Sequence, residues 1–143
     1  MEDIIEVKEE NIDFGKYFDV IKDAFYKPNY DKVKNRIEEI FNTNSSIIFG
    51  YFKDDELLGS IVVRILCNKT VIDYIGVRED FRKNNIGFSL IKYVMNKYQL
   101  PCSAETDSSS VVFYEKCGFV SKEIIKEYNG EKVVRFNCFK SLH

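Results

Sequence analysis

The chain has 143 residues, of which 45% are hydrophobic and 31% are charged. This length is typical of one domain with a single core, so we expect residues 1–143 to form one domain. Lysine and arginine together number 21, and aspartate and glutamate number 23, so the formal net charge is −2. A balanced charge argues against general nucleic-acid binding, which usually needs a basic excess.

No apolar stretch approaches the ~20 residues that a membrane-spanning helix requires. The acidic start, Met1-Glu2-Asp3, lacks the basic head of a secretory signal and the arginines of a transit peptide. We therefore expect a cytoplasmic protein that does not bind membranes.

The histidine and cysteine content limits which catalytic and metal sites the chain can form. The only histidine is the last residue, His143, which argues against a Ser-His-Asp triad or a Cys-His dyad. The four cysteines, Cys67, Cys102, Cys117 and Cys138, form no C-x-x-C pair, so no metal site is predicted. We expect all four to be reduced residues of the core.

The first third of the chain predicts a strand and two helices. Weak alternation over residues 2–9 is typical of a strand. Asp13 is expected to cap a helix that carries apolar residues at helical spacing and stops before Pro28. Asp31 is expected to cap a second helix, and residues 42–46 are turn-forming.

The middle third predicts a meander of three strands and then a helix. The strands are expected over residues 46–53, 57–67 and 70–77, which are rich in β-branched and aromatic residues. Short polar connections between them are typical of hairpins. Apolar residues at helical spacing predict a third helix after Gly87, which should end before Pro101.

The last third predicts a strand, a short helix and a closing hairpin. Strands are expected over residues 102–106, 119–128 and 131–139. Asp107 or Ser108 is expected to cap the short helix, and Gly118 is a natural left-handed stop for it. Asn129-Gly130 is the strongest two-residue hairpin signal. The order β-α-α-β-β-β-α-β-α-β-β predicts an α/β or α+β domain with one mixed sheet.

The connection between the third of the middle strands and the third helix carries the chemistry. Arg82 and Lys83 are basic, and Asn84, Asn85 and Gly87 tolerate left-handed dihedral angles. The first amides of a helix lack internal partners, and the helix dipole makes that end positive. The segment therefore favours a cradle for phosphate or pyrophosphate, although an ordinary turn is the alternative.

This segment resembles the acetyl-CoA signature of the GNAT N-acetyltransferase superfamily, Arg/Gln-x-x-Gly-x-Gly/Ala. Residues 82–87 read Arg-Lys-Asn-Asn-Ile-Gly, so Asn85 replaces the middle glycine of the signature. Asparagine is the next best occupant of a left-handed position, which allows the loop shape to survive.

A second motif of the same family is similar to residues 107–119. Asp107 stands where asparagine is commonest, and Ser110 stands where alanine is commonest. Tyr114 opens the ending Tyr-Glu-Lys-x-Gly-Phe. Together the two motifs and their order extend the resemblance to nearly the whole chain. It implies a mostly antiparallel sheet with about four helices, splayed between residues 70–77 and 102–106.

The resemblance also implies the coenzyme site. Acetyl-CoA would enter the splay, and its pantetheine arm would pair with the exposed backbone edge of Ile75 and Val77. Its pyrophosphate would lie on the amides of residues 82–88. The coenzyme-binding residues would be Ile75, Gly76, Val77, Arg82, Lys83, Asn84, Asn85, Ile86, Gly87 and Phe88. The Ile75 amide would also steady the growing negative charge on the thioester oxygen.

Tyr114 would be the acid that protonates the departing thiolate, since it occupies the family's usual position for that role. Asp73 is the first candidate for the base that takes the amine proton. Glu105, Asp107 and water remain alternatives for the base.

The acceptor is a primary amine of a small molecule or peptide, and its pocket would be shaped by residues 26–30 and the closing hairpin. Two other functions stay open: a non-catalytic acyl-CoA-binding regulatory module of the same fold, and a partner-binding domain without a coenzyme. Dimers are common in the family, which leaves a homodimer open.

Overall fold

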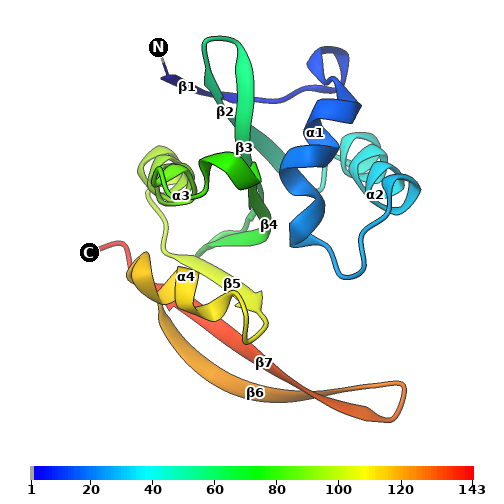
Figure 1. Ribbon diagram of the computed structural model, residues 1–143. Coiled ribbons are helices and arrows are strands. Elements are labelled where there is room, and N and C mark those ends of the chain that lie inside the picture. The colour runs from blue at the N-terminus through cyan, green and yellow to red at the C-terminus, as the bar shows by residue number, and fades with distance from the viewer. Residues whose placement is uncertain (1) are drawn as a thin grey trace.

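A seven-stranded sheet runs through the protein in the order β1-β2-β3-β4-β5-β7-β6 (Figure 1). The computed structural model describes residues 2–143. The strands are β1 (Glu2–Glu6), β2 (Ile47–Lys53), β3 (Glu56–Ile65), β4 (Thr70–Val77), β5 (Cys102–Thr106), β6 (Val120–Tyr128) and β7 (Glu131–Lys140). Only β4 and β5 are parallel neighbours, so the predicted mixed and mostly antiparallel sheet is confirmed.

Four helices cover the two faces of this sheet. Within the described residues 2–143 they are α1 (Phe14–Ile21), α2 (Tyr30–Thr43), α3 (Ile86–Tyr98) and α4 (Val111–Lys116). Three short 3-10 turns lie in the connections: η1 (Glu9–Asn11) before α1, η2 (Lys22–Ala24) between α1 and α2, and η3 (Glu79–Phe81) before α3. Successive strand residues supply two cores: Ile61 and Val63 pack with α3 and α4, and Val62 packs with α1 and α2. None of the helices within residues 2–143 is long and apolar enough to cross a membrane.

Of the predicted N-terminal caps, that of α1 is confirmed, and those of α2 and α4 are wrong. The Asp13 side chain accepts a bond from the Lys16 amide at 3.3 Å, as expected for the cap of α1. At α2 the cap is Asn29, whose side chain accepts from the Lys32 amide at 2.8 Å. Asp31 lies inside the first turn, because the extended backbone after Pro28 brings Asn29 to the capping position.

Some predicted boundaries also differ. The first strand ends at Glu6. Helix α1 ends at Ile21, where the 3-10 turn η2 begins, and Phe25 is extended although it packs in the same core as α1. Helix α3 ends at Tyr98, before Pro101 as expected, and Gln99 follows it in a left-handed conformation with φ 53°. At α4 the capping residue is Ser110, which makes no side-chain cap bond.

The cysteine prediction is wrong at one position. Cys102, Cys117 and Cys138 are buried, but Cys67 is exposed. Strand β3 ends at Ile65, and the Leu66 amide bonds the Lys69 carbonyl, so Cys67 lies in the turn rather than in the strand.

β4 and β5 run side by side for only three residue pairs, from Thr70–Cys102 to Ile72–Ala104. The pairing of β4 with β3 skips Asp73, since Val63 pairs with Ile72 and Val62 with Tyr74. This bulge strengthens the local twist, and β5 leaves β4 at the same point. The predicted splay between these strands is therefore present.

Gly76 allows helix α1 to lie directly on β4. A Cβ atom at Gly76 would stand 2.3 Å from the Val20 carbonyl oxygen and 3.0 Å from the Ile21 Cα atom. Both atoms are backbone and cannot swing away, so any side chain here would push α1 off the sheet. The absence of a side chain at Gly76 therefore sets how closely α1 lies on β4.

We expect Gly76→Ala to lower the free energy of unfolding by about 1–3 kcal/mol, the usual range for overpacking. Urea denaturation of the variant and the wild type measures the difference. Gly15→Ala is the matched control, because a Cβ atom there would meet only Asp13 Oδ1 at 3.6 Å. Equal midpoints for wild type and Gly76→Ala would show that α1 does not depend on this contact.

Candidate functional site

The loop between β4 and α3 has the backbone shape that the sequence predicted. After η3 the chain passes through Arg82 and reaches Asn85, which has φ 59° and ψ 23°. This left-handed conformation is reached at moderate cost by a short polar side chain. Asn85 therefore adopts the conformation expected of a glycine at this position, and α3 begins at the next residue, Ile86.

The amides of this loop are largely without acceptors. The Asn84 amide bonds the Phe81 carbonyl at 3.3 Å, and the Ser89 amide starts the helical ladder on the Asn85 carbonyl. Within residues 2–143, six amides have no acceptor: those of Arg82, Lys83, Asn85, Ile86, Gly87 and Phe88. They lie in the loop and first turn of a 13-residue helix, where the dipole adds positive potential. We call this set the amide cradle.

The side chain of Arg82 points away from the amide cradle. Its Nε donates to the Val77 carbonyl at 3.0 Å, and its guanidinium forms an ion pair with Asp23 of η2. Arg82 therefore ties the loop to β4 and to the end of α1. The backbone amide of Arg82 belongs to the amide cradle, whereas its guanidinium is paired with Asp23.

One edge of β4 is free beside the amide cradle. The Arg78 amide bonds the Leu58 carbonyl at 2.8 Å, so Arg78 points its backbone groups towards β3. Because backbone groups alternate in direction along a strand, those of Ile75 and Val77 point the other way. β5 has already diverged there, so these groups face the opening of the splay.

Helix α4 closes the other side of this opening. A Cβ atom on Gly87 would stand 2.8 Å from the Phe113 ring and 3.9 Å from Ile75 Cδ1. The missing side chain of Gly87 thus lets Phe113 pack against the first turn of α3. This contact brings α4, α3 and the free edge of β4 together.

Tyr114 lies in α4 next to Phe113 and is only 6% exposed. Its ring packs against Phe113 and Phe119, with centroids 5.2 and 5.3 Å away. Burial raises the pKa of Tyr114 well above its usual value near 10. Its hydroxyl makes no hydrogen bond with any other residue within 2–143, so the proton has no protein acceptor.

Asp73 and Glu105 lie where β4 and β5 part. Their strand neighbours Ile72 and Ala104 belong to the core under α3 and α4. The two carboxylates project from the opposite face, which α2 partly covers. The splay therefore has the amide cradle on one face and this pair of acids on the other.

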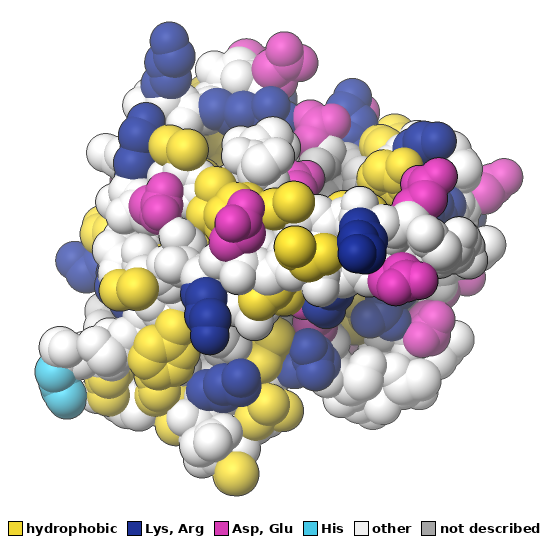
Figure 2. All heavy atoms as spheres, turned by 90° about the horizontal axis from the view of Figure 1, so that it is seen from below, with side chains coloured by type: hydrophobic (Ala, Val, Ile, Leu, Met, Phe, Trp, Pro, Cys, Tyr) yellow, Lys and Arg dark blue, Asp and Glu magenta, His cyan; other side chains and the backbone are white. Residues whose placement is uncertain are grey.

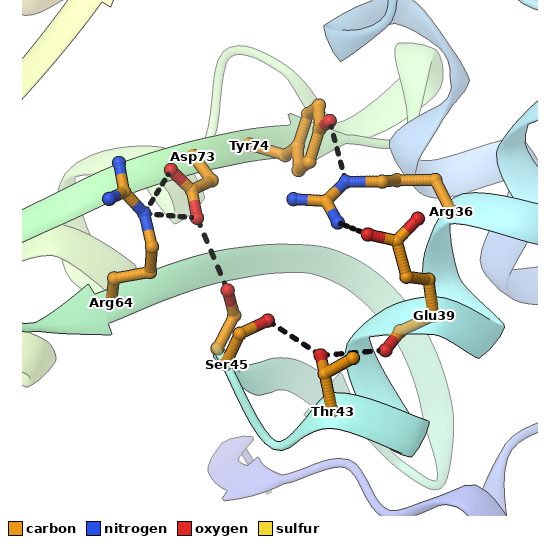
Figure 3. A network of polar contacts seen from close by, with 8 residues as sticks. Arg36, Glu39, Thr43, Ser45, Arg64, Asp73 and Tyr74 are labelled. Atoms are coloured by element: carbon orange, nitrogen blue, oxygen red, sulfur yellow. Dashed lines mark hydrogen bonds and ion pairs between the residues drawn. The ribbon is translucent and has the colours of Figure 1, made fainter.

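Each of these carboxylates is held by basic residues. Arg64 Nε donates to both oxygens of Asp73 at 2.9 Å, and Ser46 Oγ donates to Oδ2 at 3.2 Å (Figure 3). Glu105 forms ion pairs with Lys126 and, at 3.3 Å, with Arg135. Partial burial alone raises the pKa of Glu105, but the two cations outweigh it and the pKa of Glu105 is lowered.

Asp107, the third acid considered from the sequence, serves the turn before α4. It accepts bonds from the amides of Ser109 and Ser110 at 3.1 and 3.0 Å. Burial raises the pKa of Asp107, but these bonds and the Ser109 hydroxyl outweigh it, so the pKa is lowered. This arrangement stabilises the anion and disfavours Asp107 as a base.

The junction between α1 and α2 reaches the same opening through an aromatic contact that sequence reasoning missed. Phe25 stacks on Tyr74 with ring centroids 4.2 Å apart, and the Tyr74 hydroxyl accepts from Arg36 Nε at 3.3 Å (Figure 3). Tyr26 is 79% exposed. The strand position of Tyr74 beside Ile75 was the only signal in the sequence for this wall.

Two cavities, of about 250 and 320 Å³, lie beside η1 and α2. None of their lining residues belongs to the amide cradle or to the wall made by Phe25 and Tyr74. Figure 2 shows the molecule from below, where Lys and Arg side chains lie beside a notch in the surface.

Comparison with known proteins agrees with this geometry. The sequence matches the family model described as the acetyltransferase (GNAT) domain over residues 6–139. No curated protein matches the sequence.

Solved structures share the fold at low sequence identity. An acetyltransferase from Bacillus subtilis in complex with CoA is 20% identical, with a TM-score of 0.72 and all of both chains covered. A GNAT family acetyltransferase from Elizabethkingia anophelis with acetyl-CoA bound is 20% identical, with a TM-score of 0.69 over 98% of this chain and 97% of that one. The ribosomal-protein-S18-alanine N-acetyltransferase from Escherichia coli is 13% identical, with a TM-score of 0.73 over 99% and 94%.

Proposed function

The chain belongs to the GNAT acetyltransferase family, and from that premise we propose that it transfers an acetyl group from acetyl-CoA to a primary amine in a ternary complex. The observation that carries the proposal is the amide cradle next to the free edge of β4. A diphosphate accepts bonds from such amides, and an extended pantetheine arm has the amide groups to pair with a free strand edge.

The first step is attack of a neutral amine on the thioester carbon. A carbon–nitrogen bond forms, and negative charge grows on the thioester oxygen. The Ile75 amide faces the opening and is positioned to donate to that oxygen. The carbon–sulfur bond then breaks, and the products are an acetamide and the CoA thiol.

Acetyl-CoA should raise the melting temperature of the wild type, because a ligand that binds only the folded state stabilises it. Asn85→Gly should keep this rise, since glycine adopts a left-handed conformation freely. Asn85→Val should reduce it, since a β-branched residue strains that conformation. Thiol release from acetyl-CoA over a panel of primary amines then measures turnover.

The outcomes separate the functions. No rise in melting temperature would overturn the coenzyme assignment. A rise without thiol release for any amine would support the non-catalytic acyl-CoA-binding module instead.

We propose that Tyr114 is the acid that gives a proton to the departing thiolate. The hydroxyl keeps its proton at neutral and mildly alkaline pH because burial raises its pKa, and no other protein group holds that proton. Helix α4 places it on the α3 side of the splay, close to Phe113 and the first turn of α3.

Tyr114→Phe should lower kcat by about 100-fold or more while the affinity for acetyl-CoA changes little, because only the acid is removed. Wild-type kcat should also show no loss from ionisation of this group as the pH rises to 10. Tyr98→Phe is the control, since burial raises the pKa of Tyr98 too but it lies at the far end of α3. Unchanged turnover in Tyr114→Phe would remove the acid role.

We propose that Asp73 is the base that accepts the proton of the amine, directly or through water. Asp73 stands at the parting of the strands, two residues before Ile75, whereas the lowered pKa values of Glu105 and Asp107 make those groups weaker bases. Three accepted bonds leave Asp73 with acceptor capacity on Oδ1.

Asp73→Asn should reduce kcat/KM for the amine about tenfold at pH 7. The deficit should shrink as the pH rises, because the amine then loses its proton without help. Glu105→Gln should show the same pH dependence of kcat/KM as the wild type. If Glu105→Gln shows the pH-dependent deficit and Asp73→Asn does not, the base is Glu105.

A further inference from the structure

The five arginines of the chain divide into two groups by their place around the splay. Arg78 bonds Glu56 and Asp80 through all three of its nitrogens, and Arg82 is bonded to Asp23 and Val77. The other three, Arg36, Arg64 and Arg135, all lie on the α2 side of the splay. Each of these three keeps terminal N–H groups that bond no other residue within 2–143.

Arg64 and Arg135 each use only Nε, so both keep a free fork, and Arg64 is the one that contacts the proposed base, Asp73. Only its Nε is used, for Asp73, so both terminal nitrogens are available. Its side chain is 44% exposed, whereas that of Asp73 is 14% exposed. A planar fork of this kind matches a carboxylate in two parallel hydrogen bonds.

The pair of Arg64 and Asp73 therefore presents a positive and a negative group side by side. The head group of an amino acid carries the reverse arrangement, an ammonium beside a carboxylate. An ammonium on Asp73 Oδ1 and a carboxylate on the Arg64 fork would satisfy both partners at once.

The local charge selects against a polycation. The four ion pairs on this side of the splay contain four cations and three anions. The cations are Arg36, Arg64, Lys126 and Arg135, and the anions are Glu39, Asp73 and Glu105. A polyamine would add positive charge to a surface that already has an excess of it, whereas a zwitterion adds none.

We propose that the acceptor is a free α-amino acid, whose carboxylate binds the terminal nitrogens of Arg64 while its amino group faces Asp73. This assignment rests on the proposed acetyl transfer. The ammonium gives one proton to Asp73 or water, and the neutral nitrogen attacks the thioester carbon. As the carbon–sulfur bond breaks, the nitrogen loses its second proton to water and the departing thiolate takes a proton from Tyr114, which is replaced from water. The products are an N-acetylamino acid and the CoA thiol.

The test compares each of the standard amino acids with its decarboxylated amine, for example phenylalanine with phenethylamine and lysine with cadaverine. For at least one pair, wild-type kcat/KM by thiol release should be at least tenfold higher for the amino acid. Arg64→Gln should reduce this ratio at least fivefold, and Arg64→Lys should give an intermediate ratio because it keeps the charge but loses the fork.

The ratio is the informative readout, because any effect of Arg64 on Asp73 or on folding applies equally to both members of a pair. Arg78→Gln is the matched control, since it removes an arginine that faces Glu56 and Asp80, and it should leave the ratio unchanged. Calorimetric titration of amino acids into the CoA-saturated protein gives a second readout that does not need turnover.

A wild-type ratio near one for every pair, or an unchanged ratio in Arg64→Gln, would overturn the amino-acid assignment and leave the acetyl transfer intact. Absence of both turnover and amino-acid binding in the CoA-saturated protein would also overturn it. Failure of acetyl-CoA to raise the melting temperature would instead overturn the acetyl transfer itself.

Discussion

The parting of β4 from β5 is the feature on which the rest of the site depends. A parallel pair would normally continue its ladder, but here the ladder stops after three residue pairs, next to the bulge at Asp73. The bulge turns β4 away and leaves the backbone groups of Ile75 and Val77 without a strand partner. Unpaired strand groups are costly inside a fold unless solvent or a ligand satisfies them. The opening therefore brings a binding edge and two carboxylates to one place.

Packing on both faces holds this opening in shape. On one face Gly76 brings the backbone of α1 onto β4, and on the other Gly87 admits the Phe113 ring to the first turn of α3. Both glycines act through the absence of a side chain rather than through a special dihedral angle. The free edge of β4 is thus fixed between helices that cannot approach or retreat without losing buried contacts.

Local chemistry explains why much of this was predictable from the sequence. Strand and helix order follows from hydrophobic periodicity, and the left-handed conformation of Asn85 follows from its small polar side chain. The pairing of Arg64 with Asp73 and the stacking of Phe25 on Tyr74 join residues far apart in the chain. Such contacts depend on register and on the bulge, which periodicity does not specify. The exposure of Cys67 has the same origin, since it depends on where β3 ends.

The two bonds of Arg82 have a consequence for how the loop would bind the proposed diphosphate. Its side chain joins the loop to Val77 and to Asp23, and Asn85 is already in its left-handed conformation. Recognition can then proceed on a preorganised backbone, and little conformational entropy is lost on association. Asp23 also lies in the connection that leads to Phe25, so the bond between Arg82 and Asp23 links the loop to the wall made by Phe25 and Tyr74.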